Sequence, residues 1–253
     1  MAYIIDFIQY SKSHRKMQMF SSTIFLLLLK NRPNIRPSHA HRCPLHPAHI
    51  AVYWLQTQRG SCSYERQKII IDVVVDVQKD FITGTLANEQ AQANVAHLAK
   101  VAKAHAEAGH WMFFTRDTHE DNYLDTREGR RLPVEHCVEG EDGWNFAPEL
   151  EDAMAATEPE VTHIVNKPTF GSYMLPSDIL DELMAHNKAA TDIEKFVIYG
   201  YCTDICVISN AMVLRAAFPE TEIEIQSDCC AGVTPRSHQT ALDAMRNCQF
   251  TIV

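Results

Sequence analysis

Short runs of β-branched and aromatic residues alternate with longer segments of helical periodicity from residue 69 to the end of the chain. The runs predict six strands, at 69–75, 111–115, 161–165, 196–199, 223–225 and 250–253. The segments between them predict helices at 91–108, 148–155, 176–187, 204–217 and 235–247. Alternation of this kind is typical of a parallel sheet, so we predict an α/β fold: one doubly wound domain of six parallel strands with helices on both faces.

Charge divides the chain into two parts. Residues 1–66 carry nine Lys and Arg against two acidic residues, whereas residues 67–253 carry fourteen against thirty. The acidic part is long enough for one substantial core, and its charge argues against nucleic-acid binding and favours a small-molecule substrate. We predict a domain at 67–253. For 1–66 we expect a basic leader without regular structure or translated upstream sequence from a misplaced start; a presequence or a membrane-surface arm is the alternative.

Two further features of the composition concern location. The apolar run at 24–29 is shorter than the roughly 20 residues that cross a bilayer, and Lys30, Arg32 and Arg36 follow it without a small-residue cleavage site. The eight cysteines do not follow the spacing of a secreted disulfide framework, and the four between 202 and 230 are poorly spaced for a zinc cluster. We therefore expect no membrane partner, reduced thiols and a cytoplasmic location.

Chemically matched residues follow three of the predicted strands. Asp76 follows the first strand, Lys167 the third and Cys206 the fourth, at the start of a predicted helix. The carboxyl ends of parallel strands meet at one edge of a sheet, where ligands bind. A carboxylate can accept a thiol proton, an ammonium can stabilise the thiolate, and a helix start favours the thiolate form. Each residue alone suits a structural role, but together they predict an acyl-transfer site.

The loop after the second strand contains a second set of candidate ligands. It has two imidazoles and two carboxylates, from Asp117, His119, Glu128 and His136. Such a set suits zinc, manganese or iron with open positions for water or substrate. Acidic loops are commonly just solvated, and Asp121 and Asp125 are rival ligands in the same loop.

Five short motifs occur in an order that resembles one family. DVQKDF, the Asp-x-His loop at 117–119, LPVEHC, NKPTFGS and GYCTDICV resemble the isochorismatase-like cysteine hydrolases, and most of all their nicotinamidase branch. The resemblance implies a Rossmann-like three-layer fold and a catalytic triad of Asp76, Lys167 and Cys206. It implies one divalent metal ion, with zinc favoured over manganese and iron, bound by Asp117, His119, Glu128 and His136. It also implies a cis peptide between Tyr201 and Cys202 and an oxyanion hole built from the N–H groups of Cys202 and Cys206.

The activity that this resemblance implies is metal-assisted hydrolysis of an amide through a thioester on Cys206. The predicted reaction is that of a nicotinamidase, which converts nicotinamide and water to nicotinate and ammonia, and relatives imply a homo-oligomer. The alternatives are another amide or carbamoyl hydrolase on the same triad, or a non-catalytic scaffold domain. Isochorismate hydrolysis is less favoured, because by resemblance that branch lacks the cysteine and the metal ligands.

Four residues are expected to contact the substrate: Phe81, Leu132, Phe170 and Tyr201. The two phenylalanines match positions that stack on the substrate ring in nicotinamidases, although ordinary core packing would also explain them. The family often has Trp or Phe shortly before the last metal histidine, where this chain has Leu132 to Glu135. Another departure is Asp72, which interrupts the first apolar run. A buried carboxylate there needs a partner, so the alternative is that the strand begins after it.

Overall fold

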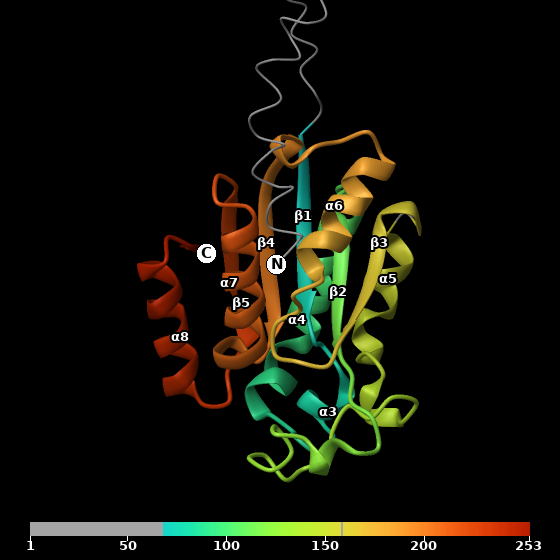
Figure 1. Cartoon of the computed structure of the whole chain (residues 1–253), viewed down its shortest axis with the longest axis vertical. Helices are drawn as coiled ribbons and strands as arrows, with labels where there is room; N and C mark the ends of the chain where they lie inside the picture. The colour runs from blue at the N-terminus through green and yellow to red at the C-terminus, as the bar shows by residue number, and fades with distance from the viewer. Residues whose placement is uncertain (1–67, 158) are drawn as a thin grey trace, which may run out of the picture. The chain divides into compact units, whose positions relative to one another are not determined.

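Six parallel strands form one open sheet (Figure 1). The computed structural model describes residues 68–157 and 159–253, so the predicted leader at 1–66 lies outside the described residues. The strands are β1 Ile69–Val75, β2 Trp111–Asp117, β3 Thr162–Lys167, β4 Ile193–Tyr201, β5 Glu222–Ala231 and β6 Thr251–Ile252. Their order is β3-β2-β1-β4-β5-β6, and each neighbouring pair is parallel. The predicted six-stranded parallel sheet is confirmed.

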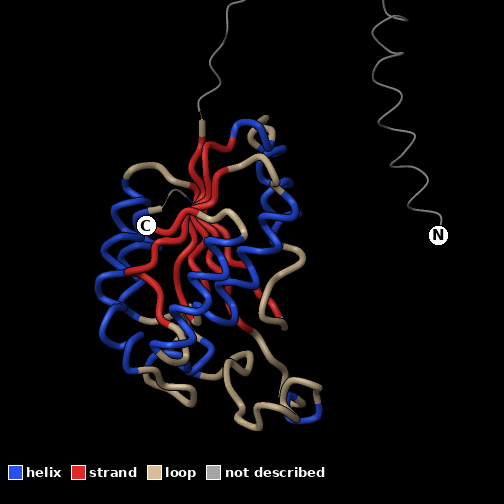
Figure 2. Tube along the Cα trace, turned by 90° about the vertical axis from the view of Figure 1, so that its left-hand side faces the viewer, coloured by secondary structure: helices blue, strands red, loops and turns tan. Residues whose placement is uncertain are grey.

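Helices cover both faces of this sheet, as Figure 2 shows from the side. They are α3 Lys79–Ile82, α4 Glu89–Glu107, α5 Glu151–Ala156, α6 Leu175–Ala185, α7 Ile208–Ala217 and α8 Pro235–Asn247. Right-handed crossovers place α4 and α5 on one face, because β1, β2 and β3 advance in one direction, and α6, α7 and α8 on the other. Among the described residues, none of the helices combines the length and apolarity that a bilayer crossing requires.

Local sequence explains where the two longest helices begin and end. The side chain of Asn88 accepts hydrogen bonds from the N–H groups of Gln90 and Ala91 at the start of α4. Gly109, with φ of +84°, follows its end, a conformation that favours glycine. Thr234 caps α8, whose first residue is Pro235. These residues hold the ends of α4 and α8 at fixed points beside the sheet.

Several predicted boundaries shift in the structure. The segment predicted as a helix at 204–217 starts with a π-helical turn at Thr203–Val207, and α7 follows it. The helix predicted at 148–155 divides into a 3₁₀ turn, Pro148–Leu150, and α5. Strands β2 and β3 extend to Asp117 and Lys167, beyond their apolar runs. Backbone pairing between the strands continues into the polar residues at these ends, whereas a prediction from apolar residues stops at the first polar residue.

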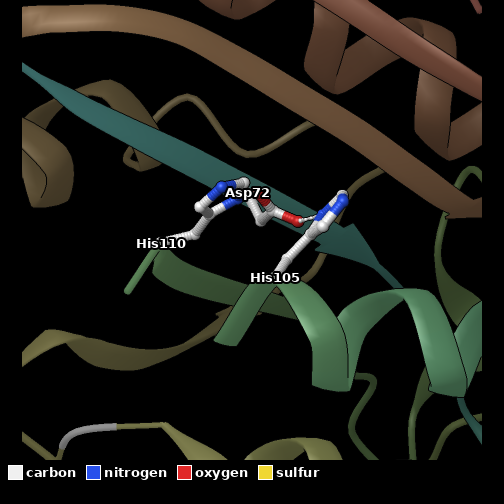
Figure 3. A group of neighbouring side chains, drawn as sticks. All are labelled: Asp72, His105 and His110. Atoms are coloured by element: carbon white, nitrogen blue, oxygen red, sulfur yellow. Dashed lines mark hydrogen bonds and ion pairs between the residues drawn. The ribbon is translucent and has the colours of Figure 1, made fainter. Parts of the chain in front are cut away.

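Asp72 lies inside β1 and is fully buried, so the suggestion that the strand begins after it is wrong. His105 Nδ1 and His110 Nδ1 each lie 2.7 Å from a different oxygen of its carboxylate (Figure 3), and the Tyr199 hydroxyl donates to it at 2.7 Å. Burial by itself raises the pKa of Asp72, but the hydrogen bonds from His105, His110 and Tyr199 outweigh it and lower the pKa. The carboxylate that interrupts the apolar run therefore has three partners in the core.

Candidate active site

Four strand ends meet at the carboxyl edge of the sheet. Asp76 follows β1, Asp117 ends β2, Lys167 ends β3 and Cys206 lies in the π-helical turn after β4. Because the strand order is β3-β2-β1-β4, these ends are neighbours, and Asp117 pairs directly with Lys167 in the ladder. Residues spread over 131 positions of sequence therefore share one edge.

The Lys167 ammonium contacts the other three side chains of this site. Its Nζ lies 2.6 Å from Asp76 Oδ2, 3.2 Å from Asp117 Oδ1 and 3.7 Å from Cys206 Sγ. All four side chains are buried. The residues predicted as a triad are thus brought into contact, with one ammonium between two carboxylates and a sulfur.

Asp76 has the properties of a proton acceptor. Burial raises its pKa, Lys167 lowers it and the nearby Asp117 carboxylate raises it, so that the pKa lies above the ordinary value. The Thr115 hydroxyl donates to Oδ1 at 2.7 Å, and Oδ2 lies 2.6 Å from Lys167 Nζ. Because the same ammonium contacts the Cys206 sulfur, Oδ2 is on the thiol side of the carboxylate.

The surroundings of the Cys206 sulfur favour its thiol form. Burial raises the pKa of Cys206, Lys167 lowers it, and the pKa remains well above the ordinary value. Cys206 lies in a π-helical turn ahead of α7, where burial is the largest influence on this pKa. The sulfur needs a base to become a nucleophile, and Asp76 is the adjacent candidate.

The turn that presents Cys206 is held by its neighbours. The Asn210 amide donates to the Cys206 carbonyl at 2.9 Å and accepts from the Ser172 N–H at 2.9 Å, which fastens the loop after β3 to the turn. The Tyr201–Cys202 peptide is cis, as the resemblance implied. Among the described residues, the Cys202 N–H donates to no acceptor, so it is free to bind a substrate oxygen.

The predicted metal ligands converge beside Lys167. His119 Nε2 and His136 Nε2 lie 3.2 Å and 3.5 Å from the same oxygen of Asp117, and Glu128 Oε1 lies 3.8 Å from His119 Nε2. The ligand atoms of Asp117, His119 and His136 all lie within 4.8 Å of one another. Within the described part of the chain, the rivals Asp121 and Asp125 join no such cluster.

The donor set fits a divalent ion. Glu128 Oε1 is buried without a hydrogen-bond partner in the described residues, which a bound cation would supply. His136 Nδ1 contacts the Val134 carbonyl at 2.8 Å, and this contact leaves Nε2 as the ligand atom. Two imidazole nitrogens with carboxylate oxygens are typical ligands of zinc and related metals.

Gln78 is a positioning residue that the sequence analysis missed. It is buried, its side-chain amide donates to the Asp117 carbonyl at 2.9 Å, and its side-chain oxygen accepts from the Asp117 N–H at 2.7 Å. Thr115, which bonds Asp76, was missed as well. The sequence offers only their positions as a signal: Gln78 is inside DVQKDF, and Thr115 is two residues before Asp117.

A cavity of about 960 Å³ opens onto Cys206. Three predicted substrate contacts, Phe81, Leu132 and Phe170, line it. The Tyr201 side chain does not reach it; its hydroxyl instead contacts the Ala91 carbonyl on α4 at 3.2 Å. Further lining residues come from the segment before α4 and its first turn, from the Cys206 turn and from the start of α8: Thr85, Leu86, Ala87, Asn88, Glu89, Gln90, Ile205, Val233 and Pro235. The sequence carries no distinctive signal for these residues.

Comparison with known proteins places this arrangement in a family. The family model of the isochorismatase domain matches residues 71–253, which include every candidate site residue. A comparison with curated proteins found no significant match.

Solved structures share the fold. The chain is similar to a nicotinamidase/pyrazinamidase from Bacillus subtilis, with 21% identity and a TM-score of 0.63 over 73% of this chain and 99% of that one. It is similar to a pyrazinamidase from Pyrococcus horikoshii in complex with zinc, with 23% identity and a TM-score of 0.57 over 73% and 98%. It is also similar to an N-carbamoylsarcosine amidase from Thermoplasma acidophilum, with 22% identity and a TM-score of 0.55 over 73% and 95%. The chain shares its fold with all three. Because the family model matches residues 71–253, the chain belongs to the isochorismatase family of hydrolases.

Proposed function

We propose that this protein is a metal-assisted cysteine amidohydrolase that converts nicotinamide and water to nicotinate and ammonia. The observation that carries the proposal is the contact of Lys167 Nζ with both Asp76 Oδ2, at 2.6 Å, and Cys206 Sγ, at 3.7 Å, beside a cavity. Two of the similar solved structures, from Bacillus subtilis and Pyrococcus horikoshii, are named as pyrazinamidases, which supports an aromatic amide as substrate.

In the first half of the reaction, Cys206 is acylated. The S–H proton passes to Asp76 Oδ2, and the sulfur forms a bond to the carbonyl carbon of the amide while the carbonyl π electrons move to oxygen. The free N–H of Cys202, together with that of Cys206, stabilises this oxygen. When the electrons return, the C–N bond breaks, and the nitrogen takes the proton from Asp76 and leaves as ammonia.

In the second half, water hydrolyses the thioester. Water gives a proton to Asp76 as its oxygen bonds to the carbonyl carbon, the C–S bond breaks, and the sulfur recovers the proton from Asp76. The net products are a carboxylic acid and the original thiol. Lys167 stays charged throughout, because its pKa is well above the ordinary value: burial lowers it, but Asp76, Cys206 and Asp117 raise it more.

A divalent ion held by Asp117, His119, Glu128 and His136 would supply a Lewis-acidic centre beside the bound amide. The Gln78 side chain positions the Asp117 backbone, and the Val134 backbone carbonyl orients the His136 ring. Phe81 and Phe170 form apolar walls of the cavity for an aromatic ring.

Replacement of the nucleophile tests the proposal. Cys206→Ala is expected to reduce ammonia release from nicotinamide to background, because the variant lacks the thiol that Lys167 contacts and that forms the thioester. Metal content, measured by elemental analysis, should equal that of the wild type, since Cys206 is outside the ligand cluster. Cys248→Ala, which alters an exposed thiol, is the matched control and should keep full activity. Substantial turnover by Cys206→Ala would contradict this nucleophile.

A further inference from the structure

The cavity continues well beyond the thiol and the metal ligands. Its volume of about 960 Å³ lies near the upper end of the roughly 300–1,000 Å³ that is usual for sites of drug-sized ligands. A one-ring amide seated between Cys206 and the metal ligands fills only the inner part. We define the remaining part, bounded by Leu86, Ala87, Ile205, Val233 and Pro235, as the outer groove.

We infer that the outer groove binds the uncharged, apolar body of an amide larger than a single ring, such as a fused bicyclic aromatic carboxamide. The inference rests on the proposed function and specifies its substrate class. It is carried by three observations: the groove is held in shape, its wall is apolar, and the acidic residues Glu89, Asp117 and Glu128 line the cavity without a lysine or arginine.

Hydrogen bonds between distant segments hold the groove in shape. The Asn88 side chain, before α4, donates to the Gly232 carbonyl at 2.8 Å. The Val233 N–H donates to Asp204 Oδ1 in the Cys206 turn at 3.0 Å. The three segments that line the groove are therefore tied to one another, which makes the groove preformed and lowers the ordering cost of binding.

The wall of the cavity exposes apolar side chains that a small substrate would leave in water. Leu132, Phe170 and Val233 are 37%, 44% and 56% exposed. Leu132 is in the segment where the resemblance leads us to expect an aromatic wall. Covering these side chains with an apolar ring removes their surface from water, which favours the larger ligand.

Charge excludes another class of amide. The charged residues among those that line the cavity are Glu89, Asp117 and Glu128, and the lining includes neither lysine nor arginine. Away from the metal ligands, a substrate with its own carboxylate, such as an N-carbamoyl amino acid, would meet Glu89 and find no lysine or arginine. The cavity lining therefore favours neutral amides, which separates this site from one built for carbamoylated acids.

The test compares three amides on the metal-loaded enzyme: nicotinamide, quinoline-3-carboxamide and N-carbamoylglycine. We expect kcat/KM for the bicyclic amide to exceed that for nicotinamide by about tenfold or more, and N-carbamoylglycine to give no turnover. Val233→Trp, which fills the groove, should lower kcat/KM for quinoline-3-carboxamide at least about tenfold, mainly through KM, and should affect nicotinamide much less. Met184→Trp, at an exposed position outside the lining, is the matched control and should change neither.

The outcomes separate the inference from the proposed function. Turnover of nicotinamide with weaker turnover of the bicyclic amide would overturn the inference and leave the proposed function standing. Equal losses for both amides in Val233→Trp, or efficient turnover of N-carbamoylglycine, would also overturn the inference. If the folded, metal-loaded enzyme released ammonia from none of the three, the proposed function itself would be contradicted.

Discussion

Two buried carboxylates, Asp72 inside β1 and Asp76 directly after its end, have opposite properties. Both side chains are 0% exposed, yet the pKa of Asp72 is lowered and that of Asp76 is raised. Burial raises both, so the partners decide the outcome. Asp72 accepts hydrogen bonds from Tyr199 and two histidines, whereas Asp76 shares one ammonium with a second carboxylate.

The difference separates a structural carboxylate from a reactive one. The oxygens of Asp72 are both engaged by donors, so this carboxylate can act as a charge that ties α4 and the start of β2 to β1. Asp76 instead pairs through Oδ2 with Lys167, the ammonium that also contacts the Cys206 sulfur. Two acids four residues apart, one inside β1 and one just after it, therefore have different roles because their partners come from different elements.

The largest expected effect comes from exchanging the two carboxylates for amides. Asp76→Asn should lower kcat for amide hydrolysis by roughly 10² to 10⁴, the usual contribution of a general acid-base residue, because the thiol loses its base. Asp72→Asn should leave kcat near the wild-type value, since Asp72 is outside the cavity lining. Steady-state ammonia release from the folded variants measures both. Similar losses of kcat in the two variants would remove the distinction between them.

The two substitutions should affect the stability of the fold in the reverse order, with the larger loss in Asp72→Asn. Asp72→Asn is expected to lower the free energy of unfolding by about 1–3 kcal/mol near pH 6, because buried donors lose their charged acceptor. Denaturation in urea measures the difference. Asp228→Asn, at an exposed carboxylate that also contacts a histidine, is the control and should cost less.

This difference in stability should depend on pH. The pKa of His105 is raised above its ordinary value of 6.5: the hydrogen bond to Asp72 raises it, burial lowers it, and among the flanking charges Lys195 lowers it and Glu224 raises it. The contribution of charged His105 to stability is therefore complete below pH 6.5 and is lost as the pH rises through the pKa of His105 in the folded state. The lowered pKa of Asp72 has the opposite sign, so its contribution is present above 3.8 and is lost on acidification. The gap between wild type and Asp72→Asn should thus shrink from pH 6 to pH 9; a constant gap would exclude a charged His105.

A smaller effect should sharpen the account of Asp76. The hydrogen bond from Thr115 to Oδ1 lowers the pKa of Asp76. Thr115→Val removes this bond and should raise that pKa, so the acid limb of the pH–rate profile should move to higher pH. The loss of one hydrogen bond corresponds to a decrease of about tenfold or less in kcat. Thr115→Ser retains the hydroxyl and should restore both values. An unshifted profile in Thr115→Val would show that Thr115 does not tune the base.

Periodicity carried most of the fold. The six strands, in their order along the chain, and the span of α8 follow from the sequence pattern, because buried strands read as short apolar runs and a half-buried helix as an apolar stripe. The pattern was less informative at element ends, where β2 and β3 continue into Asp117 and Lys167 through backbone pairing alone. The π-helical turn before α7 was not predicted, since a local hydrophobic pattern does not distinguish it from the first turn of an α-helix.

Residue chemistry at the strand ends determined which groups could react. The sequence by itself determined the parallel α/β fold and the convergence of Asp76, Lys167 and Cys206, because parallel strands place their carboxyl ends at one edge. Only the tertiary structure decided the protonation tendencies of these groups, the partners of Asp72, the support of Asp117 by Gln78 and the extent of the cavity. The reason is that pKa values and cavity shape depend on burial and on contacts between segments far apart in sequence, which no local pattern encodes.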